Sequence, residues 1–222
     1  MKAMILAAGL GTRMRPLTDQ TPKPLLPVAG KPLIVWHLEA LAAQGVAEVV
    51  INVSHRREQL MQALGQGEAW GLTIHWSVEE QPLETAGGII QALPWLGQQP
   101  FLLINGDVWW RPRWDLMQLA EGDLAHLLLV DNPVHHAQGD FMLCQGRVHE
   151  GEDSRLTFAG ISLLSPDLFR GIMPGVHPLA PLLRQAIRAG LVSGHYYPGP
   201  WVDVGTPQRL QSLDQALRSG GI

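Results

Sequence analysis

The first stretch with residue types suited to chemistry is a glycine-rich, basic segment near the N-terminus. Gly9 and Gly11 follow an apolar run at positions 4–6, so they come where a strand is expected to end. Glycines permit a tight turn and leave backbone N–H groups open to phosphate oxygens. Arg13 adds a guanidinium group and Lys23 an ammonium group nearby in the chain. The segment therefore predicts a polyphosphate site.

Two common phosphate-binding fingerprints do not fit this segment. The dinucleotide pattern requires a third glycine where Met14 stands,. The P-loop requires Ser or Thr after Gly-Lys, but Pro32 follows Lys31,. Four prolines between positions 16 and 27 restrict the backbone, so we expect a stiff loop,. A long, stiff, basic loop is uncommon without a function, although an ordinary strand–helix connection with exposed cations is the alternative.

Two aspartates stand where they could hold a metal ion. Asp107 follows an apolar strand expected at 99–104, at the same edge of the sheet as the glycine segment,. A carboxylate there can bind Mg²⁺ that also bridges phosphates, or it can be a turn residue bonded to its own backbone. Asp203 lies between two valines just before the last expected helix, which is unusual unless its charge is used. The alternative for Asp203 is a capping or turn residue.

The glycine segment resembles the signature loop of the sugar-phosphate nucleotidylyltransferases, the enzymes that make NDP-sugars. The resemblance rests on the Gly-x-Gly-Thr-Arg turn at 9–13, on Pro-Lys-Pro at 22–24 and on Trp-x-Asp-x-Gly-Thr at 201–206. It implies that Asp107 and Asp203 bracket one Mg²⁺, the expected cofactor. It also implies that Arg13 and Lys23 are catalytic: Arg13 would hold the β- and γ-phosphates, and Lys23 would contact the attacking phosphate.

The resemblance further implies a set of nucleotide-binding residues. Gln81 can offer both a donor and an acceptor to a pyrimidine edge, and two glycines after it would let the backbone approach the ring. Uracil or thymine is therefore the preferred base, although this stretch also reads as a plain helix start capped by Thr85. The predicted nucleotide-binding residues are Ala8, Gly9, Gly11, Thr12, Arg13, Lys23, Gln81, Gly87 and Gly88.

The candidates for sugar binding are Asn105, Gly139, Asp140 and Glu150. The family resemblance implies that a backbone N–H after a glycine, and then a glutamate, contact the sugar. Gly139 and Glu150 match that order, and Asp140 is adjacent. Many relatives follow the glutamate with a lysine for the sugar phosphate, whereas Gly151 follows here. Arg147 or Arg155 could replace that lysine, or the contact is absent.

The resemblance as a whole implies Mg²⁺-dependent transfer of UMP from UTP to a sugar 1-phosphate. It runs closest to short uridylyltransferases that accept N-acetylmuramate 1-phosphate in peptidoglycan recycling. The lactyl carboxylate of that sugar would meet one of four arginines, Arg111, Arg113, Arg147 or Arg155. The alternatives are a glucose 1-phosphate thymidylyl- or uridylyltransferase, a mannose 1-phosphate guanylyltransferase or a phosphocholine cytidylyltransferase. A non-catalytic, NDP-sugar-binding regulatory protein is the alternative from a different class.

Composition restricts the partners. The formal net charge of −4 argues against a general nucleic-acid binder, which needs a basic excess,. Cys144 is the only cysteine, so no internal disulfide can form,. We expect small-molecule substrates, a cytoplasmic location, no membrane partner and a monomer. His135 and His136 have no partner at metal-ligand spacing and are expected in a solvated loop,.

Strands that alternate with helices predict an α/β fold with a mixed, mainly parallel, Rossmann-like sheet and helices on both faces. The resemblance implies the nucleotide-diphospho-sugar transferase fold. We expect one domain over 1–222, with a nucleotide-binding half at about 1–107 and a sugar-phosphate-binding half at about 108–222. The expected strands lie at 1–7, 46–53, 71–77, 99–104, 124–130, 141–149, 156–164 and 191–197, and the expected helices at 32–43, 55–64, 85–93, 178–189 and 207–218.

Overall fold

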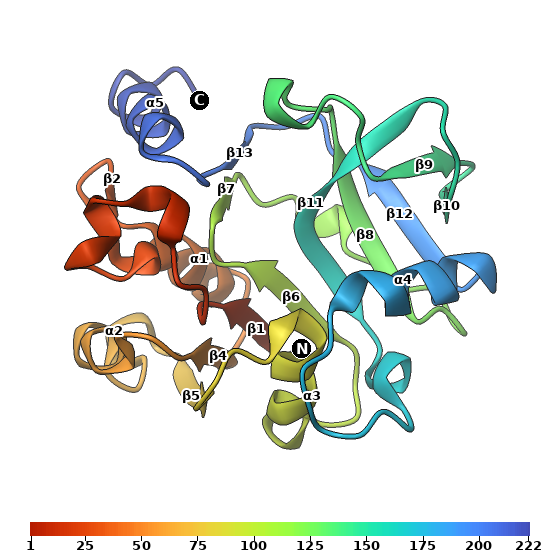
Figure 1. The fold of residues 1–222 in the computed structure, drawn as a ribbon, viewed down its shortest axis with the longest axis horizontal. Coiled ribbons are helices and arrows are strands. Elements are labelled where there is room, and N and C mark those ends of the chain that lie inside the picture. The colour runs from red at the N-terminus through yellow and green to blue at the C-terminus, as the bar shows by residue number, and fades with distance from the viewer.

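A nine-stranded mixed sheet forms the centre of the computed structural model, which describes residues 1–222 (Figure 1). Its strand order is β5-β4-β1-β6-β11-β8-β12-β10-β9. The strands are β1 (Ala3–Leu6), β4 (Glu48–Val53), β5 (Thr73–Val78), β6 (Phe101–Asn105), β8 (Ala125–Val130), β9 (Phe141–Cys144), β10 (Arg147–His149), β11 (Arg155–Leu164) and β12 (Val192–Tyr196). The predicted α/β fold class is confirmed.

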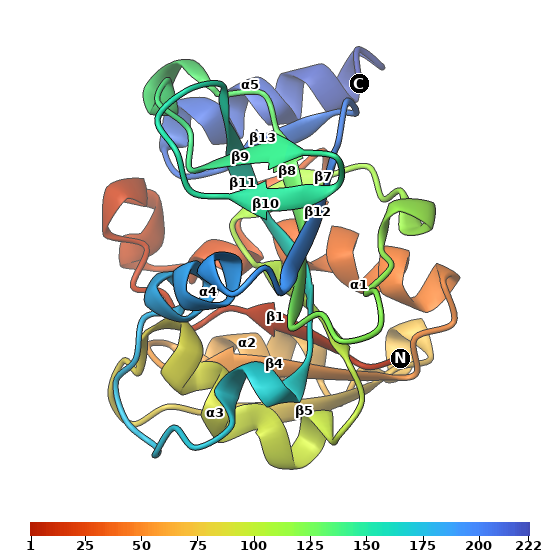
Figure 2. The same ribbon diagram turned by 90° about the vertical axis from the view of Figure 1, so that its right-hand side faces the viewer.

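The four strands from β5 to β6 are parallel, and they are apolar because helices cover both of their faces,. Helices α1 (Leu33–Ala43) and α2 (Arg57–Leu64) pack on one face. Helices α3 (Glu84–Leu96) and α4 (Leu179–Arg188) pack on the other. Figure 2 shows α1 and α4 on opposite sides of the central strands. Alternate side chains of β1 enter the two cores: Ala3 and Ile5 the first, Met4 the second,.

The second half of the chain extends the same sheet. β11 is antiparallel to β6 and β8, and β12 is parallel to β8. The single strand expected at 141–149 is wrong: it is a hairpin, in which β9 and β10 are joined at Gln145 and Gly146, both with positive φ. β9 also pairs with β11, so the hairpin folds back over the sheet. The sequence pattern did not separate two short strands joined by a two-residue turn.

A two-stranded ribbon outside the main sheet was not expected from the sequence. β7 (Val108–Trp110) pairs antiparallel with β13 (Trp201–Asp203), and α5 (Pro207–Arg218) follows directly. The ribbon and α5 share a third apolar cluster with the signature loop, which includes Met14, Trp109 and Val204. The loop itself contains three 3₁₀ turns and a short ribbon, β2 (Pro27–Val28) with β3 (Lys31–Pro32).

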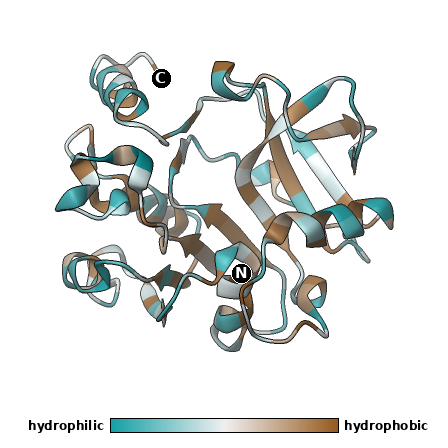
Figure 3. Ribbon diagram, in the orientation of Figure 1, coloured by the Kyte–Doolittle hydropathy of each residue, from teal (hydrophilic) through white to brown (hydrophobic).

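Hydropathy follows this layering. Figure 3 shows hydrophobic residues along the central strands and hydrophilic ones on the outer sides of α4 and α5. None of the helices has the length and apolar character that crossing a bilayer requires. The expected helices are confirmed with small shifts at their ends; α3, for example, runs on to Leu96 with Pro94 in its last turn.

His37 on α1 makes stability depend on pH. Burial lowers its pKa to about 4, from 6.5, and its side chain is 2% exposed. The unfolded chain therefore binds this proton at a higher pH than the folded chain. Stability should fall as the pH drops from 6.5 to 4, by about 3 kcal/mol for a shift of this size.

Urea unfolding at a series of pH values across that window measures the effect. His37→Gln should flatten the pH dependence, although His126, whose pKa burial also lowers to about 4, should retain part of it. The matched control is His149→Gln, because His149 is exposed on β10. An unchanged slope in His37→Gln would show that another group is responsible.

Candidate functional site

The ends of β1 and β6 meet at one point, where the sheet order changes direction. The chain returns from β5 by way of α3 to place β6 on the free side of β1. Gly106 then donates its N–H to the carbonyl of Leu6 at 2.9 Å. A side chain at position 106 would collide with that carbonyl, so the close approach requires glycine. Open α/β sheets bind ligands at such a switch point, beyond the carboxyl ends of the strands.

The glycine segment leaves β1 and forms one wall of this site. The backbone N–H groups of residues 8–11 donate to no backbone acceptor, so they are available to a ligand. Gly11 has φ +63°, and a Cβ there would meet the Thr18 methyl at 2.9 Å. The Thr18 hydroxyl donates to the Gly11 carbonyl at 2.8 Å, which ties the turn to the loop that follows. Open amides in a fixed turn can bind phosphate oxygens.

A buried chain of hydrogen bonds supports this turn from behind. Ala7 donates its N–H to Asn52 Oδ1 at 2.8 Å, and Asn52 Nδ2 donates to Glu79 Oε1 at 2.7 Å. The other Glu79 oxygen accepts from the Leu83 N–H at 3.1 Å. Asn52 and Glu79 are 4% and 3% exposed. Each buried polar group is therefore paired, and the chain fixes the glycine turn relative to the segment that opens α3.

Two adjoining cavities occupy the switch point. The larger, of about 460 Å³, is lined by the glycine segment, Lys23, the Asn52–Glu79 pair and the start of α3. The smaller, of about 360 Å³, lies toward β11 and β13. Three residues line both cavities: Arg13, Asn105 and Asp107. Two ligands bound in these cavities would therefore meet at Asp107.

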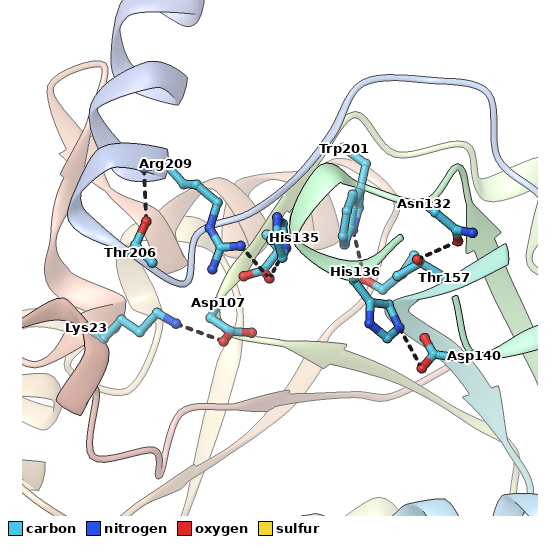
Figure 4. Close-up of polar contacts among 12 residues, drawn as sticks. Lys23, Asp107, Asn132, His135, His136, Asp140, Thr157, Trp201, Thr206 and Arg209 are labelled. Atoms are coloured by element: carbon cyan, nitrogen blue, oxygen red, sulfur yellow. Dashed lines mark hydrogen bonds and ion pairs between the residues drawn. The ribbon is translucent and has the colours of Figure 1, made fainter. Parts of the chain in front are cut away.

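The β7–β13 ribbon brings Asp107 and Asp203 together. Asp203 pairs with Val108 in the register, and Val204 donates its N–H to the Asp107 carbonyl at 2.7 Å. Lys23 Nζ lies 2.8 Å from Asp107 Oδ2. On the other side, Asp203 Oδ2 lies 3.1 Å from His135 Nε2 and 3.4 Å from an Arg209 nitrogen (Figure 4). Each carboxylate is thus paired with cationic side chains of the protein.

The donor set suits a hard divalent cation that keeps part of its coordination for substrate. Asp107 and Asp203 are the only carboxylates that line the smaller cavity. No group of three His, Cys, Asp or Glu side chains converges anywhere in the chain, which does not fit a closed structural metal site,. Mg²⁺ commonly uses one or two carboxylates and takes water and phosphate oxygens as its other ligands. The two aspartates fit that pattern.

Comparison with known proteins identifies the family. The nucleotidyl transferase family profile matches residues 2–126. The chain is 51% identical to the N-acetylmuramate alpha-1-phosphate uridylyltransferase of Neisseria meningitidis serogroup B, over 98% of both chains. It is 35% identical to the protein of the same name from Caulobacter vibrioides, over 97% of this chain and 96% of the other. The chain belongs to the nucleotidyl transferase family.

The fold of this transferase also matches solved structures. A candidate glucose-1-phosphate thymidylyltransferase from Bacillus anthracis, in complex with sucrose, has a TM-score of 0.87. That match covers 98% of this chain and 95% of the other at 21% sequence identity. The family predicted from the signature loop is confirmed, and so is the enzyme class, a sugar-1-phosphate nucleotidyltransferase.

Most residues predicted for the nucleotide side of the transferase lie together. Those that line the larger cavity are Ala8, Gly9, Gly11, Thr12, Arg13 and Lys23, and the cavity is also lined by Asn105, predicted for the sugar, and Asp107, predicted for the metal. Three others of the predicted set do not line it. Gln81 is exposed at the segment before α3, Gly87 packs on the carbonyl of Gly175, and Gly88 packs on the Glu79 carboxylate. The two glycines are required by packing within the protein.

Only one of the four residues predicted to bind the sugar lines a cavity. Asn105 lines both cavities, whereas Gly139, Asp140 and Glu150 line neither. The N–H after Gly139, that of Asp140, donates to the Leu156 carbonyl at 2.8 Å. The Glu150 carboxylate binds two arginines of α4, at 3.0 and 2.9 Å. The hydrogen bond from Arg184, together with Arg188, holds the Glu150 pKa below its usual value.

None of the four arginines expected near the sugar lines either cavity. Arg113 pairs with Asp115, and Arg147 pairs with the buried carboxylate of Asp123. Arg155 donates to the Gly151 carbonyl. Arg111 uses its backbone N–H to bond the Pro200 carbonyl. The basic residues that do line the smaller cavity are Arg13, His135 and His136.

Sequence reasoning missed several residues of the site. His135 was expected in a solvated loop but bonds Asp203, and Arg209 pairs with the same carboxylate. Asn52 could have been identified as a candidate from the sequence, because it is the one amide side chain within the apolar run 49–53. Glu79 stands at the end of the next strand in the same way. Polar residues at the carboxyl ends of buried parallel strands are candidates for such supporting roles.

Proposed function

We propose that the protein transfers UMP from UTP to N-acetylmuramate 1-phosphate, giving the UDP-sugar and pyrophosphate, as a step of peptidoglycan recycling. The observation that carries this proposal is the 51% identity, over nearly the whole chain, to a relative of that named activity. The two cavities that share Arg13 and Asp107 supply a place for each substrate. A nucleotide-binding half, about 1–107, would supply most of the lining of the larger cavity, and a sugar-phosphate-binding half, about 108–222, most of the lining of the smaller one.

The reaction needs no general base. A phosphate oxygen of the sugar 1-phosphate attacks the α-phosphorus of UTP in line. The bond from the α-phosphorus to the oxygen that bridges to the β-phosphate breaks, and pyrophosphate leaves with that electron pair. The attacking oxygen is already an anion, so the protein must hold two mutually repelling phosphates together and neutralise the charge on the leaving group.

The proposed catalytic residues are Arg13 and Lys23. Arg13, with the N–H groups of Gly11 and Thr12, would hold the β- and γ-phosphates in the larger cavity. Lys23 lies against Asp107, where the two cavities join, and would orient the attacking phosphate. Gln81, which is exposed and adjacent in the chain to the cavity-lining Pro82, would contact the uracil edge.

The proposed cofactor is Mg²⁺, held by Asp107 and Asp203. When bound, it would supply charge neutralisation for the α-phosphate and the leaving group. The aspartates would then exchange part of their contact with Lys23, His135 and Arg209 for the metal. A reaction that consumes UTP fits a cytoplasmic protein whose partners are small molecules.

The first test is pyrophosphate release with Mg²⁺, crossing UTP, dTTP, GTP and CTP with a panel of sugar 1-phosphates. We expect strong turnover with UTP and N-acetylmuramate 1-phosphate. Turnover with glucose or mannose 1-phosphate instead would support the proposed nucleotidyl transfer but show that the acceptor is a different sugar 1-phosphate. No turnover with any pair, in folded protein that still binds a nucleotide, would favour the non-catalytic NDP-sugar-binding alternative.

Lys23→Ala should lower kcat by about 100-fold or more, because it removes a fixed positive charge beside the reacting phosphates. Its melting temperature should stay close to that of the wild type, since the partner Asp107 is partly exposed and can be solvated,. Lys31→Ala is the matched control: Lys31 pairs with Glu39 and lines neither cavity. A near-normal kcat in Lys23→Ala would remove this residue from the proposed mechanism.

Asp107→Asn and Asp203→Asn should each raise the Mg²⁺ concentration for half-maximal rate about tenfold or more, because an amide is a weaker ligand for a hard cation. Mn²⁺ binding in the presence of UTP, followed by electron paramagnetic resonance, gives a readout independent of turnover. Asp115→Asn, exposed and outside both cavities, is the control. A variant with unchanged metal titrations would show that its aspartate is not a ligand.

A further inference from the structure

Apart from Asn105, the smaller cavity lacks the sugar contacts expected from the sequence. Glu150 is bound to Arg184 and Arg188, away from the cavity. None of the four arginines expected near the sugar lines this cavity either. If the acceptor is N-acetylmuramate 1-phosphate, as proposed, its lactyl carboxylate needs a hydrogen-bond donor or a cation inside this cavity.

The cavity offers three basic side chains as candidates: Arg13, His135 and His136. Arg13 also lines the larger cavity and belongs with the phosphates there. His135 is bonded to Asp203, the proposed metal ligand. His136 remains, and its only side-chain hydrogen bond is to Asp140, which does not line the cavity.

Asp140 holds the His136 ring in place. Its Oδ1 lies 3.0 Å from His136 Nε2, and its Oδ2 accepts the Phe158 N–H at 2.8 Å. Figure 4 shows the imidazole between Asp140 on one side and the Asp107 and His135 region on the other. A protonated imidazole donates from both nitrogens. Nε2 can therefore donate to Asp140 while Nδ1 donates to an anion in the cavity.

The loop that carries His136 is fixed by several bonds of its own. Asn132 Nδ2 donates to the carbonyls of Ala137 and Arg155, at 3.2 and 2.8 Å. Thr157 donates its hydroxyl to Asn132 Oδ1 at 2.9 Å. Gly139 has φ +61° and packs against Asn132, so the return of the loop requires glycine. A recognition side chain works best when its support is rigid in this way.

We propose that His136, positioned by Asp140, determines specificity by binding the lactyl carboxylate of N-acetylmuramate 1-phosphate in the smaller cavity. This inference rests on the proposed function. Asp140 is a positioning residue and does not contact the sugar itself. The pair replaces the arginine that the sequence suggested for this role.

The test compares two acceptors that differ at the lactyl group: N-acetylmuramate 1-phosphate, which carries a carboxylate there, and its methyl ester, which is uncharged at that group and larger by one methyl. With saturating UTP, the wild type should prefer the acid in kcat/KM by about tenfold or more, as expected for a charge-assisted hydrogen bond. His136→Gln should lose this preference through a raised KM for the acid, with kcat/KM for the ester and KM for UTP little changed. Asp140→Asn, which keeps an oxygen for the Phe158 N–H, should give a smaller loss in the same direction.

The control is His149→Gln, an exposed histidine on the outer hairpin, which should retain the full preference. An equal fall for acid and ester in His136→Gln would reduce His136 to a structural role and overturn the inference. So would an undiminished preference for the acid. If the wild type turns over neither muramyl acceptor but does turn over another sugar 1-phosphate, the proposed acceptor fails, and the inference fails with it. The two failures are therefore distinguishable.

Discussion

The site depends on the pairing of β7 with β13. This pairing, three residues long, brings Asp203 to the end of β6 and sets it beside Asp107, which lies 96 residues earlier in the chain. The bond from the Val204 N–H to the Asp107 carbonyl fixes the register. A displacement by one residue would turn Asp203 to the other side of the ribbon. The two carboxylates are therefore positioned by backbone geometry, before any ligand is considered.

Charge balance is the second requirement. Two carboxylates close together repel one another, and here Lys23 neutralises one while Arg209 neutralises the other, which is also hydrogen-bonded to His135. Gly205 makes this arrangement possible, because a Cβ at that position would collide with the Arg209 guanidinium and crowd Asp203. The same cations are suited to anionic substrates, so the protein uses one set of charges for both purposes.

The sequence predicted the parts of the molecule that follow from local patterns. Apolar strands, helix spacing and the signature loop led to the correct fold class and to the cluster of Gly11, Arg13 and Lys23 at one sheet edge. The β9–β10 hairpin and the β7–β13 ribbon were missed because strands of three or four residues carry too little periodicity. The side-chain partners of Glu150 and His135 depend on tertiary contacts with α4 and β13, which no local pattern encodes.

The ribbon also orders events during synthesis. A chain leaves the ribosome from its N-terminus, so the parallel strands β1, β4, β5 and β6 can assemble while residues 201–203 are still to be made. At that stage Asp107 and the glycine segment have already been synthesised, but Asp203, Arg209 and the wall formed by β13 have not. A nascent chain can thus present the phosphate-binding turn early, while the complete reaction centre can form only after Asp203 and Arg209 have been added.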